Sequence, residues 1–175
     1  MRQLADAERV RRFLHELARS AEQPTRLYLV GGATAVLMGW RPSTIDVDIE
    51  LVPETDALLR AIARLKDELA VNVELAAPSD FIPELPGWED RSRFVTQDGL
   101  LAVYHYDLYS QALAKIERGH AQDVTDVRTM LDNGLVDGAR LRHLFDQVEP
   151  QLFRYPAVNA AAFRRALDEA VGPLT

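Results

Sequence analysis

The chain has 175 residues, 47% of them hydrophobic, which is enough to bury the core of one folded domain. Its formal net charge of -7 argues against a broad nucleic-acid-binding surface, which needs clustered positive charge, but a small basic pocket remains compatible with it. There is no cysteine for a disulfide or a thiolate metal site, no apolar run of about 18 residues, and no signal-peptide pattern. We therefore expect a cytoplasmic protein with no membrane partner.

The first half of the chain has the hydrophobic patterns of a small sheet with helices. In chain order we predict a helix at 4–21, a strand at 27–30, a short helix at 33–38, a strand at 45–51, a helix at 54–69 and a strand at 71–75. Residues 76–89 carry three prolines and are interpreted as an ordered loop. Two further strands, 94–97 and 100–105, flank Asp98-Gly99, a dipeptide typical of tight hairpins.

The second half is helical in pattern, with helices predicted at about 107–118, 123–132, 138–149 and 157–170. The predicted fold class is α+β: a small mixed sheet of about four or five strands with packed helices, followed by a helical half. We expect residues 1–106 to form the α/β core and residues 107–175 to pack on it as one structural unit, with a cleft between them.

Two carboxylates stand in the alternating strand 45–51. Asp46 and Asp48 share one face of it, whereas Val47 and Ile49 share the other. Their backbones are expected to lie about 6–7 Å apart, and two anions at that separation repel each other unless a cation lies between them. Magnesium suits such a pair, although the pattern also fits a solvated strand face.

Glycines and a third acidic residue extend this candidate site. Gly31-Gly32 follows a strand and opens a helix, which favours close approach of the backbone to a phosphate, or simply a tight turn. Glu74 lies on the polar face of strand 71–75, where it suits a general base or an additional metal ligand, or is a surface glutamate at a sheet edge.

Two motifs carry a resemblance to a known superfamily. The first resembles the opening motif of the DNA polymerase β-like nucleotidyltransferases, and its double glycine is similar to the AbiEii-like toxin and DUF6036 branches; its residues are Gly31, Gly32, Arg41, Ser43, Asp46 and Asp48. The second, KIERGHAQDVTDVRTML, resembles the later motif of those branches through Lys115, Arg118, Asp123 and Asp126.

The resemblance implies an enzyme that moves a nucleoside monophosphate from a nucleoside triphosphate (NTP) to a hydroxyl of an RNA 3′ end or a protein, with Mg²⁺ or Mn²⁺ as cofactor. It implies that this enzyme is the toxin of a toxin–antitoxin pair, with an antitoxin protein as partner. The implied catalytic residues are Asp46, Asp48, Glu74 and Lys115, the first three being metal ligands. The implied nucleotide-binding residues are Gly31, Gly32, Arg41, Ser43, Lys115, Arg118, Asp123 and Asp126.

Other interpretations of these residues stay open. The acceptor of the transferred group is alternatively a small molecule, as in aminoglycoside nucleotidyltransferases, and the chain is alternatively a non-catalytic relic that binds a nucleotide or a partner. Lys115 also fits a solvated helix face, Asp123 a helix cap, and Asp126 an ion pair with Arg118 or Arg128. The four histidines show no zinc-binding spacing, and His105 is interpreted as strand packing.

Overall fold

The computed structural model describes residues 2–173, which fall into two compact units. The sheet unit contains the chain through Ala77 together with Ser92–His105. The helical unit contains Pro78–Arg91 and the chain from Tyr106 onward. The α+β class predicted from the sequence is confirmed, with a mixed sheet of five strands and a helical C-terminal half.

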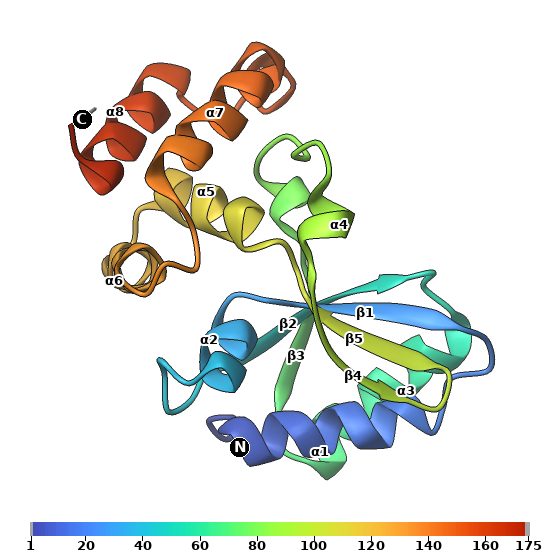
Figure 1. Cartoon of the computed structure of the whole chain (residues 1–175). Coiled ribbons are helices and arrows are strands. Elements are labelled where there is room, and N and C mark those ends of the chain that lie inside the picture. Colours follow the sequence, from blue (N-terminus) through green and yellow to red (C-terminus); the bar gives the residue numbers. More distant parts are fainter. Residues whose placement is uncertain (1, 174–175) are drawn as a thin grey trace. The chain divides into compact units, whose positions relative to one another are not determined.

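The sheet has the strand order β3-β2-β1-β5-β4 (Figure 1). Its strands are β1 (Thr25–Val30), β2 (Asp46–Val52), β3 (Asn72–Leu75), β4 (Arg93–Asp98) and β5 (Leu101–His105). β1 runs antiparallel to β2 and parallel to β5, while β2 and β3 are parallel and β4 and β5 form the predicted antiparallel hairpin. The hairpin turns at Gly99, which has a φ of 55°, a value that glycine adopts without strain.

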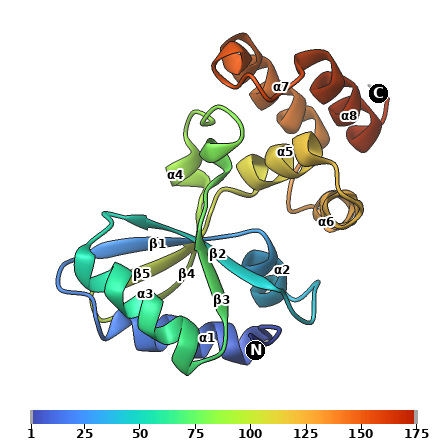
Figure 2. The ribbon, with the colours of Figure 1, turned by 180° about the vertical axis from the view of Figure 1, so that it is seen from behind.

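One face of the sheet carries the hydrophobic core. Two amphipathic helices, α1 (Ala7–Ala18) and α3 (Asp56–Glu68), run side by side along it, as Figures 1 and 2 both show. Their apolar residues pack against buried strand residues that alternate along β1, β2 and β5. These strand residues are Leu27, Leu29, Val47, Ile49, Leu51, Leu101 and Val103.

Helix α1 begins later than the hydrophobic pattern suggests. Asp6 caps it by accepting a hydrogen bond from the backbone N–H of Arg9 at 2.8 Å. The residue before the cap, Ala5, instead pairs with Thr44 through two backbone hydrogen bonds of 2.8 and 2.9 Å. The N-terminal segment is therefore extended and lies along the loop that precedes β2.

The helical unit is built around one central helix. Its elements are η1 (Pro78–Asp80), α4 (Trp88–Arg91), α5 (Leu108–Arg118), α6 (Ala121–Asp132), α7 (Gly138–Val148), η2 (Glu149–Arg154) and α8 (Ala160–Val171). Helix α5 packs against η1, α4, α6, α7 and α8. Within residues 2–173, no helix is both long and apolar enough to cross a membrane.

Segment 78–91 belongs to the helical unit because its polar and aromatic side chains contact residues of that unit. The fully buried Asp107 accepts hydrogen bonds from Arg91 Nη2 at 2.8 Å and from Ser110 Oγ at 2.7 Å. Trp88 stacks on Tyr106 with ring centroids 4.3 Å apart. These partners are distant in sequence, so the apolar pattern of the segment does not reveal them.

Candidate active site

The two aspartates of β2 lie on the sheet face opposite helices α1 and α3. Asp46 and Asp48 are partly exposed, while Val47 and Ile49 between and after them are fully buried in the core. The strand alternation expected from the sequence therefore sets both carboxylates on one face. In the parallel pairing of β2 with β3, Asp48 stands directly opposite Glu74, so a third carboxylate lies next to the pair.

The amide of a neighbouring residue that belongs to neither motif links two of these carboxylates. Asn72 pairs with Asp46 across the two strands, and its Nδ2 donates to Asp46 Oδ1 at 2.5 Å. The same Nδ2 donates to Glu74 Oε1 at 3.2 Å. The sequence contained a signal for this residue. Asn72 is polar and stands two positions before Glu74 in an alternating strand, so the two side chains share one face of the sheet.

The double glycine lies beside the second aspartate. Val30, the last residue of β1, pairs with Asp48, and the chain then turns at Gly31 with a φ of 62°. A Cβ at Gly31 would lie 3.3 Å from Asp48 Oδ2. A Cβ at Gly32 would lie 2.0 Å from Thr44 Oγ1, so the space there is already filled. Backbone conformation thus requires the first glycine and space requires the second.

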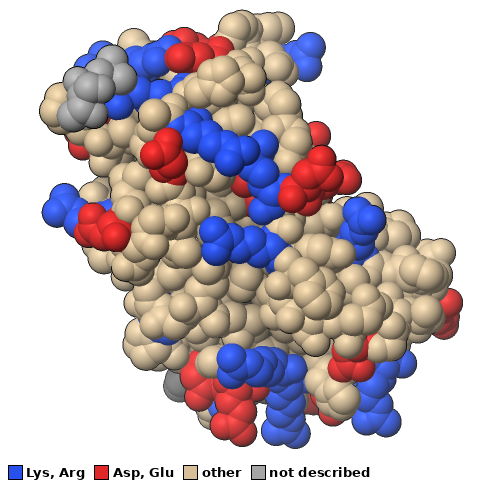
Figure 3. Space-filling model, in the orientation of Figure 1, with Lys and Arg blue, Asp and Glu red and all other residues tan. Residues whose placement is uncertain are grey.

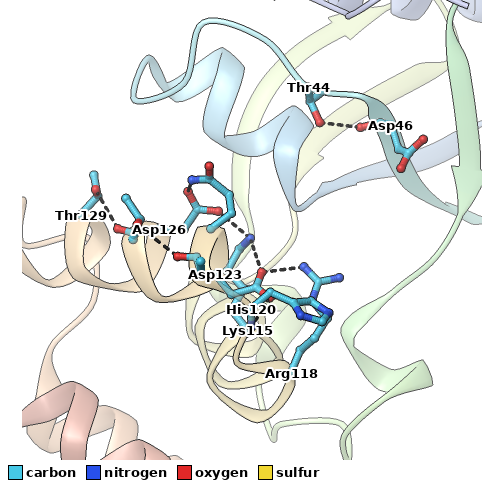
Figure 4. Close-up of polar contacts among 11 residues, drawn as sticks. Thr44, Asp46, Lys115, Arg118, His120, Asp123, Asp126 and Thr129 are labelled. Atoms are coloured by element: carbon cyan, nitrogen blue, oxygen red, sulfur yellow. Dashed lines mark hydrogen bonds and ion pairs between the residues drawn. The ribbon is translucent and has the colours of Figure 1, made fainter.

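The loop from Arg41 to Thr44 is held against this turn. Thr44 Oγ1 donates to the backbone oxygen of Asp46 at 2.9 Å (Figure 4), and its backbone pairs with Ala5. A Cβ at Gly32 would also come within 3.3 Å of Arg41 Nη1. The predicted residues Arg41 and Ser43 are both partly exposed in this loop. Thr44, which was not predicted, fixes the loop.

The helix turn after the double glycine is anchored by a histidine of β5. Thr34 Oγ1 donates to the backbone oxygen of Leu29 at 3.0 Å and lies 3.1 Å from His105 Nδ1. Because the hydroxyl hydrogen is directed to Leu29, the His105 ring donates from Nδ1. Burial, and then the nearby Arg93 charge, lower the pKa of His105 to about 4. His105 is therefore a neutral packing residue that joins β5 to α2.

The second motif forms a compact ionic cluster inside the helical unit. The Lys115 side chain is only 6% exposed, and its Nζ lies 2.9 Å from Asp126 Oδ2 and 3.7 Å from Asp123 Oδ1. Arg118 donates two hydrogen bonds, of 2.6 and 2.7 Å, to the Asp123 carboxylate (Figure 4). Lys115 is thus a buried cation held by two aspartates from the next helix, not a solvated residue.

Asp123 has two structural roles at once. It accepts a hydrogen bond from the backbone N–H of His120 at 3.2 Å and so helps to cap α6. Burial raises the pKa of its carboxyl, but the hydrogen bonds and charges of Arg118, the Lys115 charge and the His120 backbone together outweigh burial and lower the pKa. Asp123 is therefore charged at neutral pH, as its two cationic neighbours require.

A family model described as a nucleotidyltransferase of unknown function (DUF6036) matches residues 7–167, which include both motifs.

The chain belongs to this DUF6036 family. Neither a curated protein nor a solved structure matches it. The family name assigns a nucleotidyltransferase, a class that uses an NTP and generally a divalent metal. It assigns neither an acceptor nor a biological role, and the AbiEii-like branch is not part of the match. The meeting of Lys115 with the Asp46–Asp48 pair in one pocket stays a prediction.

The donor atoms on β2 of this DUF6036 protein fit a divalent cation whose remaining ligands are water or substrate phosphates. Among residues 2–173 there is no group of three or more His, Cys, Asp or Glu side chains that could hold a metal ion. The oxygen Oδ1 of Asp48 is nevertheless buried without a hydrogen bond, although the residue makes other contacts. Magnesium commonly binds through one or two carboxylates and completes its ligand shell with substrate phosphates and water, which matches this donor set.

A separate cavity of about 670 Å³ lies in the helical unit. Helices α5, α6 and α8 line it mainly with aliphatic side chains, and Lys115 and Arg128 share it with Asp132 and Glu169. The clustered cations that a triphosphate needs are lacking among these lining residues, and the two carboxylates would repel one. The lining of this cavity therefore does not by itself suit a triphosphate.

Proposed function

We propose that this protein is a metal-dependent nucleotidyltransferase that moves a nucleoside monophosphate from an NTP to a hydroxyl acceptor. The observation that carries the proposal is the placement of Gly31 against Asp48. A polar strand face with two carboxylates lies next to a turn at which Gly31 carries no side chain. This arrangement suits a triphosphate whose charge is shared between backbone N–H groups and a cation.

The proposed reaction is a single displacement at the α-phosphorus. The acceptor hydroxyl oxygen forms a bond to that phosphorus, the bond to the oxygen bridging to the β-phosphate breaks, and pyrophosphate leaves. Glu74 would take the hydroxyl proton, since it is an exposed carboxylate in register with Asp48. Asp46 and Asp48 would hold Mg²⁺ or Mn²⁺, which when bound neutralises charge that develops on the phosphate oxygens.

Lys115 is proposed to contact the triphosphate. Phosphoryl transfer depends mostly on positioning and charge neutralisation. A lysine whose ammonium group is held in a fixed direction can therefore stabilise phosphate charge without acting as a nucleophile. Asp126 and Asp123 fix that direction through the 2.9 and 3.7 Å contacts to Nζ. Arg118, held by Asp123, is proposed as a second nucleotide contact, and Gly32, Arg41 and Ser43 would line the phosphate path.

The proposed acceptor is an RNA 3′ end or a protein hydroxyl, in keeping with a toxin of the AbiEii-like branch that an antitoxin protein restrains. On the face in Figure 3, basic side chains lie among acidic ones over both parts of the molecule. Such a surface suits an acceptor that contacts the protein over a small footprint, because a long nucleic-acid track needs a continuous basic stripe.

Transfer can be tested directly with NTPs labelled at the α-phosphate. The purified protein is incubated with Mg²⁺ and, in separate reactions, with total RNA, a protein extract or an aminoglycoside. We expect label to enter RNA or protein. Label on the aminoglycoside alone would identify a small-molecule enzyme instead, and no transfer with any NTP or acceptor would indicate a non-catalytic relic of the fold.

Matched variants separate the proposed site from contaminating activity. Asp46→Asn and Asp48→Asn should each lower the rate by about 100-fold or more, because several kcal/mol of charge stabilisation are lost. Asp90→Asn, an exposed aspartate of α4, is the control and should keep the wild-type rate. Equal rates in all three variants would show that the β2 carboxylates do not take part.

A further inference from the structure

Asn72 makes a set of contacts that spans three parts of the sheet unit. Its Nδ2 donates to Asp46 on β2 and to Glu74 on its own strand. Its Oδ1 accepts a hydrogen bond from Arg2, in the extended segment before α1. The backbone N–H of Gln3 also donates to Ala70 at 2.7 Å, so this segment lies along the entry to β3. Asn72 thus connects the segment before α1, through Arg2, to two candidate active-site carboxylates.

The chemistry of the neighbours determines how the amide is oriented. Carboxylates only accept hydrogen bonds and a guanidinium only donates them. The amide nitrogen must therefore face Asp46 and Glu74, and the amide oxygen must face Arg2. No other uncharged side chain of this size offers two donor hydrogens on one side and an acceptor on the other.

The length of Glu74 makes the shared contact possible. Glu74 stands opposite Asp48, two residues along β3 from Asn72, so its side chain must lean back along the strand to reach Nδ2. Residues i and i+2 of a strand are about 6.6 Å apart. The additional methylene of glutamate, compared with aspartate, gives this reach.

We propose that Asn72 is a positioning residue for the metal site, a statement that rests on the proposed function. Its amide holds one oxygen of Asp46 and one of Glu74, so neither carboxylate rotates freely. Within residues 2–173, no group donates a hydrogen bond to Asp46 Oδ2 or to Glu74 Oε2. One oxygen of each carboxylate is thus held by the protein, and the other is kept for the cation or the acceptor proton.

This arrangement predicts that Asn72 raises the metal affinity without touching the metal. Groups that orient metal ligands typically change metal affinity about 10- to 100-fold when they are removed. Arg2 acts one step further out, by fixing the amide, so its removal should weaken the metal less. Both losses of metal affinity can be measured with the free protein and Mn²⁺ alone, without any catalytic turnover.

The test is titration of Mn²⁺ into the purified full chain, followed by the electron paramagnetic resonance signal of the free ion. Asn72→Leu keeps the branched shape of the side chain and loses the donors, and it should weaken Mn²⁺ binding about 10- to 100-fold. Gln97→Leu removes an exposed amide from β4, the opposite edge strand, and is the matched control that should bind as the wild type does. Urea unfolding of each variant, run in parallel, shows whether the fold survives.

The possible results are distinct. If folded Asn72→Leu binds Mn²⁺ as tightly as the wild type, or more tightly, the positioning role is overturned. If Asn72→Leu does not fold, Arg2→Met decides: Arg2 is exposed, and a several-fold loss supports the proposal while an unchanged affinity overturns it. A wild-type chain that binds no Mn²⁺ at millimolar concentration would refute the metal site and the proposed function together. Wild-type binding with an unaffected Asn72 variant would refute the positioning role alone.

Discussion

At the scale of single residues, the turn after β1 has no spare volume. A Cβ on Gly32 would lie 2.0 Å from Thr44 Oγ1 and 2.7 Å from Thr44 Cβ. Since Thr44 also pairs with Ala5 and bonds to Asp46, it cannot move without disturbing the loop. The geometry of the double glycine is therefore tied to the start of the carboxylate strand.

Gly32→Ala should destabilise the protein by about 1–3 kcal/mol, the usual cost of added volume in a packed site. Urea denaturation of the variant and the wild type measures this. Adding Thr44→Ala removes the closest atom but keeps Cβ at 2.7 Å, so the double variant should recover only part of the loss. Additive effects of the two substitutions would show that the residues do not compete for the same space.

His105 makes folding sensitive to acid. Its pKa is about 4 in the folded protein and near 6.5 when it is unfolded. As the pH falls below about 6.5, the unfolded chain takes up the proton first, so folding is progressively weakened until the pH is below about 4. The full effect of this shift is about 3 kcal/mol, and about 2 kcal/mol of it is lost by pH 5.

His105→Asn tests this effect, because asparagine keeps a donor near the position of Nδ1 but does not titrate in this range. The unfolding free energy is measured at pH 7 and pH 5 for both proteins. The wild type should lose about 2 kcal/mol more than the variant between those values. An equal loss would mean that another group causes the acid sensitivity.

At the scale of elements, the pairing of α5 with α6 depends on a buried ion pair. Both Lys115 and Asp126 are almost completely buried, and they lie 2.9 Å apart. Breaking one partner of such a pair leaves a charge that water cannot reach, which costs far more than loss of a surface pair. The cluster therefore sets the register of the two helices as well as the direction of Lys115.

Asp126→Asn should lower the unfolding free energy by about 1–3 kcal/mol, because the only ion pair left to Lys115 is the longer one with Asp123. The control is Glu68→Gln, which breaks an exposed pair with Arg64 on α3 and should cost less than about 0.5 kcal/mol. Both values come from urea denaturation at pH 7. If the two substitutions cost the same, Lys115 is more accessible to water than its burial implies.

At the scale of the whole molecule, the two motifs fall in different units. The sheet unit holds the carboxylates and the glycine turn, and the helical unit holds Lys115 and Arg118. The family match at residues 7–167 includes parts of both. A ligand that binds only the folded state stabilises the chain, because it shifts unfolding by mass action.

Mg²⁺ with the preferred NTP should therefore raise the melting temperature. At a concentration 100 times the dissociation constant, the gain is about 2.7 kcal/mol, or about 5 °C or more for a chain of this length. Differential scanning fluorimetry with each NTP measures it. The double variant Asp46→Asn/Asp48→Asn should show little shift. No shift for the wild type at millimolar ligand would remove the basis of the nucleotide site.

Period-two alternation and turn residues are local properties, so the sequence by itself determined that Asp46 and Asp48 share a strand face, that glycines precede them, and that the C-terminal half is helical. The attachment of segment 78–91 to the helices, the bridge from Asn72 to Asp46 and Glu74, and the burial of Lys115 between two aspartates were decided only in the tertiary structure. These contacts join residues far apart in sequence or in different elements. Such pairings depend on strand register and helix packing, which no single stretch of residues encodes.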